Sequence, residues 1–193
     1  MSEGSPAQGT VGTLGTALRL LRRHAPAAFL AAAAAAAVNA VPDVLRHVLV
    51  WDDPRLWTAL AVDVVGFLTG LVAQLWVTGA VAGLLDGGRL TPSGALRRGV
   101  ALAVRAVRRA PGTVLAGVVT GGAVSALLTL PASVAALGFD RVLGPLDSPD
   151  VGAFAVATVS DFVASTATLP YLAFVLVLVA TGWRAGQPGT SRS

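Results

Sequence analysis

The residues of this sequence that could do chemistry are acids, amides and hydroxyls placed inside long apolar segments. Residues spaced three or four apart lie on one face of a helix. Carboxylates, amides and hydroxyls on such a face could coordinate a cation, accept a proton or line a path for a solute. Two groups show this spacing: Asp63, Gly66, Gly70 and Gln74 in one segment, and Thr158, Asp161, Ser165 and Thr168 in another.

Metal, cofactor and enzyme chemistry find little support in the remaining residues. The chain has no Cys, and its two His are His24 and His47. Thiolate ligands, disulfides and a cysteine nucleophile are therefore excluded. Neither His has the Ser and acid pattern of a catalytic triad, and no phosphate-binding loop or dinucleotide fingerprint occurs. We therefore expect no catalytic residue, no metal and no cofactor.

The composition indicates that lipid surrounds most of the chain. Apolar residues make up 54% and charged residues 12% of the 193 residues, against roughly one quarter charged in soluble domains. The net charge is +4, and every basic residue is Arg. These Arg residues flank apolar segments and do not form a soluble basic domain, so we expect no nucleic-acid partner.

Four intervals without charge are long enough to cross a membrane, for which about 20 helical residues are needed. The first could also be a secretory signal, because Arg22 and Arg23 precede an Ala-rich run. We expect a kink or an early stop at Pro131, near the outer end of the third interval. The predicted fold class is all-α, with four transmembrane helices: Ala25–Pro42, Val64–Leu85, Ala110–Phe139 and Phe162–Trp183.

The distribution of Arg predicts how these spans are oriented. Arg residues gather before the first span, between the second and third, and after the fourth, whereas the two other connections are acidic overall. By the positive-inside rule, the Arg-rich segments face the cytoplasm. We expect a multi-pass protein of the cytoplasmic membrane with both termini inside the cell.

The two halves of the chain show signs of a duplication. The Arg-x-x-Arg-Arg cluster at 19–23 recurs at 105–109, and each copy is followed by a Pro and an apolar span. Chance similarity in a chain rich in Ala, Val, Leu and Arg is the alternative. We predict two parallel repeat units, 1–86 and 87–183, each with a basic amphipathic segment and two spans. A disordered cytoplasmic tail is predicted over 184–193.

The segment 92–109 is predicted to be an amphipathic helix, with its Arg residues in one arc and Leu96, Val100, Val104 and Val107 in another. Such a helix should lie along the cytoplasmic headgroups, with its Arg side chains on anionic lipid phosphates. The segment 14–23 is a shorter copy. Charge that only fixes topology, or docking of an acidic partner, are the alternatives. The candidate headgroup contacts are Arg19, Arg22, Arg23, Arg97, Arg98, Arg105, Arg108 and Arg109.

Depth decides how the polar residues inside the spans are interpreted. A charged Asp at mid-membrane costs roughly 2.5 to 3.5 kcal/mol. Asp63 and Asp161 lie near the outer interface, where the helix dipole favours a carboxylate, so a structural role stands beside ion or proton binding. Gln74 and Asn39 lie deeper and are expected to form interhelical hydrogen bonds. Close helix packing is predicted at the pairs Gly66/Gly70, Gly79/Gly83 and Gly117/Gly121.

A basic amphipathic helix is followed by a Pro and an apolar span, as in 93–111. This order resembles the membrane domain that is fused to some bacterial glycerophosphodiester phosphodiesterases. It also resembles related stand-alone membrane proteins. The resemblance covers roughly 14–38 and 91–128. It implies an accessory or anchoring module in a bacterial cytoplasmic membrane. The phosphodiesterase catalytic domain is absent from this sequence, so the resemblance implies no phosphodiesterase activity and no catalytic residue.

Two functions of different classes remain open. The first is a non-enzymatic accessory or assembly module that associates, through small-residue helix faces, with itself or with another membrane protein. The alternative is a small secondary transporter or permease subunit, which usually has a broken helix at its site. Pro170, near the middle of the fourth span, is the nearest candidate for such a break. The path would run between the repeat units and be lined by Asp63, Gln74, Asp161 and Thr168.

Overall fold

The computed structural model describes residues 6–50, 55–87, 89–137 and 151–182, and the regular secondary structure in these ranges is helical. The predicted all-α class is thus confirmed over the described residues. The predicted tail over 184–193 lies outside them. In chain order the helices are α1 (Pro6–Arg23), α2 (Ala25–Val50), α3 (Leu56–Gly87), α4 (Ala95–Arg109), α5 (Pro111–Leu137) and α7 (Val151–Thr181).

Four of these helices are long and apolar enough to cross a membrane. The apolar stretches have 18, 28, 26 and 31 residues, so each reaches the length of roughly 17–25 residues that a bilayer core requires. The chain is therefore a polytopic membrane protein, with helical secondary structure in the described ranges. The stretches are Ala25–Pro42 in α2, Leu60–Gly87 in α3, Pro111–Ala136 in α5 and Val151–Thr181 in α7.

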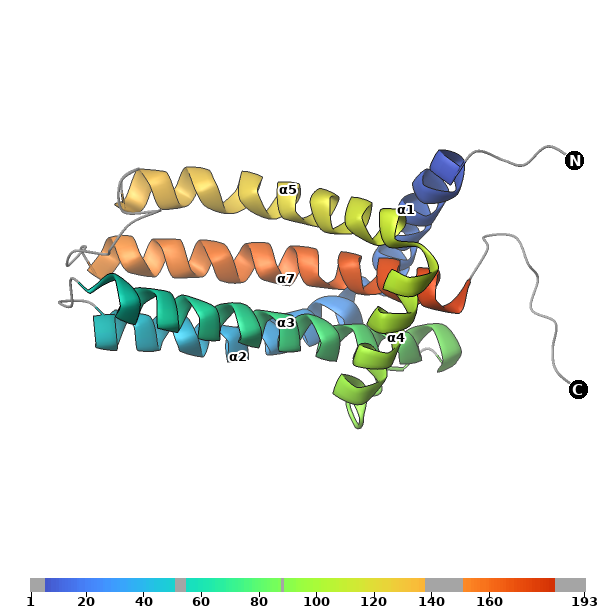
Figure 1. Cartoon of the computed structure of the whole chain (residues 1–193), viewed down its shortest axis with the longest axis horizontal. Helices are drawn as coiled ribbons and strands as arrows, with labels where there is room; N and C mark the ends of the chain where they lie inside the picture. Colours follow the sequence, from blue (N-terminus) through green and yellow to red (C-terminus); the bar gives the residue numbers. More distant parts are fainter. Residues whose placement is uncertain (1–5, 51–54, 88, 138–150, 183–193) are drawn as a thin grey trace, which may run out of the picture.

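The spanning helices lie side by side and run alternately in opposite directions, with α7 between α5 and the pair α2 and α3 (Figure 1). α7 contacts each of the other described helices. Its residues 173–180 are buried, and Val77 and Val81 of α3 are fully buried as well. The core of the bundle is therefore built around the C-terminal half of α7.

The two basic amphipathic segments are both helical and lie at the same end of the bundle. Figure 1 shows α4 crossing the bundle where α3 and α7 end and α5 begins, with α1 at that end too. α4 packs on α3 and α7, and α1 packs on α7. Both helices have Arg in their last turn. The fold thus gathers most of the basic residues at one end of the spans.

Proline does not end the spanning helices. A kink or an early stop was expected at Pro131; the early stop does not occur, since α5 continues to Leu137, and the kink stays a prediction. α2 likewise continues through Pro42 to Val50, past the end of the predicted span. Ending a helix inside a bilayer leaves several backbone groups without partners, each costing several kcal/mol. This cost outweighs the single hydrogen bond that a Pro removes.

Candidate functional site

α4 meets α3 at a crossing where two glycines bring the helix backbones into direct contact. A methyl group added to Gly79 would overlap the carbonyl oxygen of Ala95. A methyl group added to Gly99 would overlap the carbonyl oxygen of Leu75. Backbone atoms cannot move aside as a flexible side chain can, so both positions require glycine. This crossing fixes α4 on the end of the bundle.

Arg98 ties the connection between α3 and α4 to the same crossing. Its Nε donates to the carbonyl oxygen of Gly79 at 2.9 Å. Its Nη2 donates to the carbonyl oxygen of Thr91 at 2.5 Å, to the Thr91 hydroxyl at 2.8 Å and to the carbonyl oxygen of Ser93 at 3.3 Å. A guanidinium presents several donors in one plane, which a Lys side chain does not. Arg98 therefore joins α3, the connection and α4 in one hydrogen-bonded cluster.

The surface of α4 divides into three faces, not the two that the sequence suggested. Ala95, Gly99 and Ala106 are buried against the bundle. A second face is apolar yet between 41% and 50% exposed, and a third is exposed and basic. Exposed apolar side chains next to Arg, on a helix held at the end of the spans, suit a position among lipid headgroups. The apolar face consists of Leu96, Val100, Val104 and Val107, and the basic face of Arg97, Arg105 and Arg108.

The Arg residues predicted to bind lipid headgroups fall into two groups. Arg19 and Arg109, like Arg98, form hydrogen bonds inside the chain: Arg19 donates to the Thr16 hydroxyl at 3.0 Å and Arg109 to the carbonyl oxygen of Ala180 at 3.5 Å. Arg109 thus places its charge at the C-terminal end of α7, where the helix dipole favours a cation. Lipid contact stays a prediction for the whole set. The second group is Arg22, Arg23, Arg97, Arg105 and Arg108, all of which are exposed; Arg19 and Arg109 are exposed as well.

Gln74 is the deep polar residue that joins α3 to α7. Its Nε2 donates to the carbonyl oxygen of Leu169 at 3.3 Å and to the hydroxyl of Thr78 at 3.3 Å. Interhelical hydrogen bonds inside membranes contribute about 0.6 kcal/mol on average, so Gln74 makes a packing contact of modest strength. α7 stays helical through Pro170 and lacks the break that a transporter site usually has.

The other residues predicted to line a path have different surroundings. Thr168 donates to the carbonyl oxygen of Ala164 in its own helix at 2.8 Å, and it lines a groove shared with α1 and α5. Asp161 is exposed on α7. The side chain of Asp63 lies outside the described residues. The transporter hypothesis stays a prediction, and these contacts add nothing to it.

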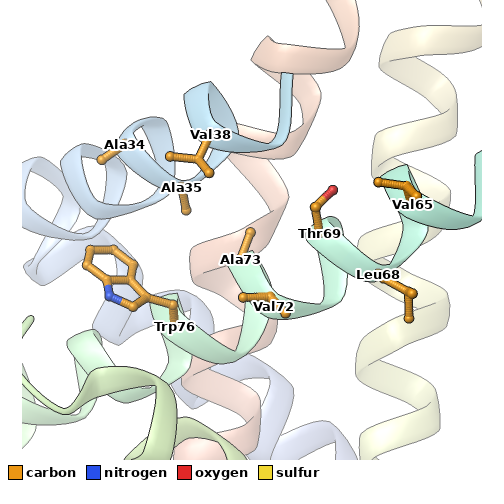
Figure 2. A pocket seen from close by; sticks show the side chains of 9 residues that line it. All are labelled: Ala34, Ala35, Val38, Val65, Leu68, Thr69, Val72, Ala73 and Trp76. Atoms are coloured by element: carbon orange, nitrogen blue, oxygen red, sulfur yellow. The ribbon is translucent and has the colours of Figure 1, made fainter. Parts of the chain in front are cut away.

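A second polar contact and an apolar cleft lie between α2 and α3. The hydroxyl of Thr69 donates to Oδ1 of Asn39 at 2.8 Å, and Gly70 lies opposite the same amide. The cleft beside them has a volume of about 480 Å³, and Figure 2 shows the Trp76 ring at one end of it. Apart from Thr69, mainly Ala, Val and Leu side chains line this cleft. Its chemistry is therefore that of a hydrocarbon surface.

The buried face of α4 and the role of Arg98 were not predicted from the sequence. Ala95, Gly99 and Ala106 are small residues at spacings of four and seven, a pattern that predicts close packing against another helix. Gly99 in particular sits inside a helix, where Gly is unfavourable by roughly 1 kcal/mol relative to Ala. A Gly that is kept despite this cost was the signal in the sequence that the backbone of another helix approaches Gly99.

These features define a class: a polytopic membrane protein with four spanning helices and two basic amphipathic helices at one end of the bundle. In the comparisons with known proteins, no family model, no curated protein and no solved structure matched the chain. Across the described ranges, no group of three or more His, Cys, Asp or Glu side chains is arranged to hold a metal ion.

Proposed function

We propose that this protein is a non-enzymatic accessory or assembly module of the cytoplasmic membrane. The observation that carries the proposal is the crossing of α3 and α4, where Gly79 and Gly99 bring two backbones together and Arg98 secures the connection. α4 therefore presents its basic face in a fixed position beside the spans. A fixed basic surface suits docking of an acidic partner, because complementary charge supplies specificity and speeds association. The resemblance to an anchoring membrane domain supports the same role.

The assembly surface of this proposal is the basic face of α4, not a small-residue face. Several predicted small-residue positions are used inside the chain: Gly79 packs on Ala95, and a methyl on Gly117 would lie 2.9 Å from a Val175 methyl. The outer face of α5 carries large exposed side chains such as Leu127, which is 76% exposed. We assign this α5 face to lipid, since lipid tails solvate Leu and Val as well as another helix does.

Cysteine cross-linking in native membranes tests the assembly role, and the chain contains no native Cys to interfere. Ala101 is exposed on α4, four residues from both Arg97 and Arg105, so Ala101→Cys probes the basic face and keeps every Arg. We expect a cross-linked product heavier than the monomer. Leu127→Cys, on the lipid face of α5, is the matched control and should give monomer. Monomer alone from Ala101→Cys, under every condition, contradicts the proposal.

The proposed orientation places both termini and α4 in the cytoplasm. Ser93 is exposed in the connection between α3 and α4, whereas Ser148 belongs to a predicted outer connection outside the described residues. A membrane-impermeant maleimide should label Ser148→Cys in intact cells and should label Ser93→Cys only after permeabilisation. The opposite labelling pattern would show that the chain has the inverted orientation, with α4 outside the cell.

We also propose that the halves 1–86 and 87–183 arose by duplication as parallel repeats. In support, each amphipathic helix packs on the second span of the other half: α1 on α7, and α4 on α3. The halves also differ, because α4 packs on α7 as well, and α1 has no corresponding contact with α3 in the described part of the chain. Divergence of the two basic helices after duplication accounts for that difference.

A further inference from the structure

A groove of about 500 Å³ lies where α1 packs against α5 and α7. α1 is held there by a hydrogen bond of 3.0 Å between the hydroxyls of Thr10 and Thr113. The groove is open to its surroundings, since Leu18 on one wall is 42% exposed and Val124 on the other is 45% exposed. The lining includes Leu14 and Leu18 from α1, Gly121 and Val124 from α5, and Thr168 and Tyr171 from α7.

The wall of this groove is chemically a hydrocarbon surface, although hydroxyl groups line it. The hydroxyl of Thr120 donates to the carbonyl oxygen of Ala116 at 2.7 Å, and that of Thr168 to the carbonyl oxygen of Ala164 at 2.8 Å. The hydroxyl groups of both threonines thus donate to backbone carbonyls of their own helices, as Thr commonly does in spanning helices. The remaining surface consists of Leu, Val, Ala and Gly together with the side chain of Tyr171, and it matches a flexible, mainly apolar ligand.

Helical spacing puts a positive charge next to residues that line this groove. On α1, Arg22 follows Leu18 by four residues and Gly15 by seven, and these two residues line the groove. Residues at these spacings share one helix face, so Arg22 continues the row that forms the groove wall. Its side chain is exposed. An apolar groove that leads to an exposed guanidinium is complementary to a ligand with a long apolar tail and an anionic head.

Size favours a single alkyl chain over a helix as the occupant. A helix with its side chains is at least about 10 Å across, so about 500 Å³ would hold little more than one of its turns. An alkyl chain is much thinner and can follow the groove along α5 and α7. We propose that the groove binds an anionic phospholipid, with one acyl chain between α1 and α5 and the phosphate on Arg22.

Binding of defined lipids to the purified full-length chain tests this site. Native mass spectrometry in detergent, with added phosphatidylglycerol or phosphatidylcholine, measures how much of each lipid is retained. We expect the wild-type chain to prefer phosphatidylglycerol. Arg22→Gln should weaken that binding about fivefold, the effect of one basic residue near an anionic surface, and should leave phosphatidylcholine unchanged. Arg89→Gln, at an exposed position in the connection between α3 and α4, is the matched control and should bind as wild type does.

Two groove variants test where the acyl chain lies. Gly121 lines the groove, and an added Cβ there meets no atom within 4 Å, so Gly121→Leu should fill the space and reduce binding of both lipids. Gly122→Leu, at the neighbouring exposed position, should not. Leu18→Gln changes an exposed wall residue, leaves the core intact, and should also weaken both lipids. The proposed site would be overturned by wild-type binding in both Arg22→Gln and Leu18→Gln. Equal losses in Arg22→Gln and Arg89→Gln would overturn it as well. The assembly role and orientation would be untouched, because neither enters this measurement.

Discussion

Gly79→Ala is expected to lower the free energy of unfolding by about 1–3 kcal/mol, the usual cost of forcing an extra group into a packed site. The new methyl would overlap the carbonyl oxygen of Ala95, so α4 would have to move away from α3. Such a shift also stretches the hydrogen bond from Arg98 to the carbonyl oxygen of Gly79. The loss should therefore lie toward the upper end of that range.

Unfolding by SDS in mixed micelles measures this change, with Gly122→Ala as the control. Gly122 also lies inside a spanning helix, but a methyl there meets no atom within 4 Å. Ala is a better helix former than Gly by up to about 1 kcal/mol, so the control should be neutral or more stable than wild type. Equal stability of Gly79→Ala and Gly122→Ala would show that the two helices do not touch at this crossing.

The second large effect is expected at Arg98. Removing its guanidinium in Arg98→Gln leaves the acceptors on Gly79, Thr91 and Ser93 without their common donor. A hydrogen bond from a charged group contributes about 1.5–3 kcal/mol, and we expect a total loss of about that size because the connection can relax. Arg98→Lys should be intermediate, since a single ammonium cannot span all three acceptors.

Arg97→Gln is the control for Arg98→Gln, because Arg97 is a neighbouring, exposed Arg on the same helix. It should change stability by no more than about 0.5 kcal/mol, measured by the same SDS titration. The double variant Gly79→Ala with Arg98→Gln should lose less than the sum of the single losses, because both act on one crossing. Equal losses from Arg97→Gln and Arg98→Gln would contradict the cluster described here.

The number of spanning helices and the presence of two amphipathic helices could be predicted from the sequence, because long apolar runs and a helical period are local properties. The ends of the helices could not. The predicted first span ended at Pro42 because the charged Asp43 follows, and a kink or an early stop was expected at Pro131, yet both prolines lie inside helices. In a bilayer, backbone groups that are left without hydrogen-bond partners at a helix end cost more free energy than the one hydrogen bond that a proline removes. A rule learned from helices in water, where a proline often ends a helix, therefore does not predict where these helices end.

The candidate site was harder to predict, because contacts between helices decide which side chains are engaged. Arg97 and Arg98 are adjacent and look equivalent in the sequence. Packing of Gly99 on Leu75 turns α4 so that Arg98 reaches Gly79 while Arg97 points outward. Gln74 and Thr168 share a polar character, yet Gln74 contacts Leu169 and Thr168 lines the α1 groove. Sequence spacing shows which face of a helix a residue lies on, but it does not show which residue of another helix it contacts.

The central place of α7 has a consequence for how the protein is made. During translation α2 and α3 emerge early, and they can pair with each other as soon as both are in the bilayer. α5 has its main partner in α7, which leaves the ribosome after it. Until α7 has been inserted, α5 must therefore be surrounded by lipid or contact the insertion machinery. A ribosome that pauses before residue 151 would prolong this exposed state and invite mispairing with other nascent membrane proteins.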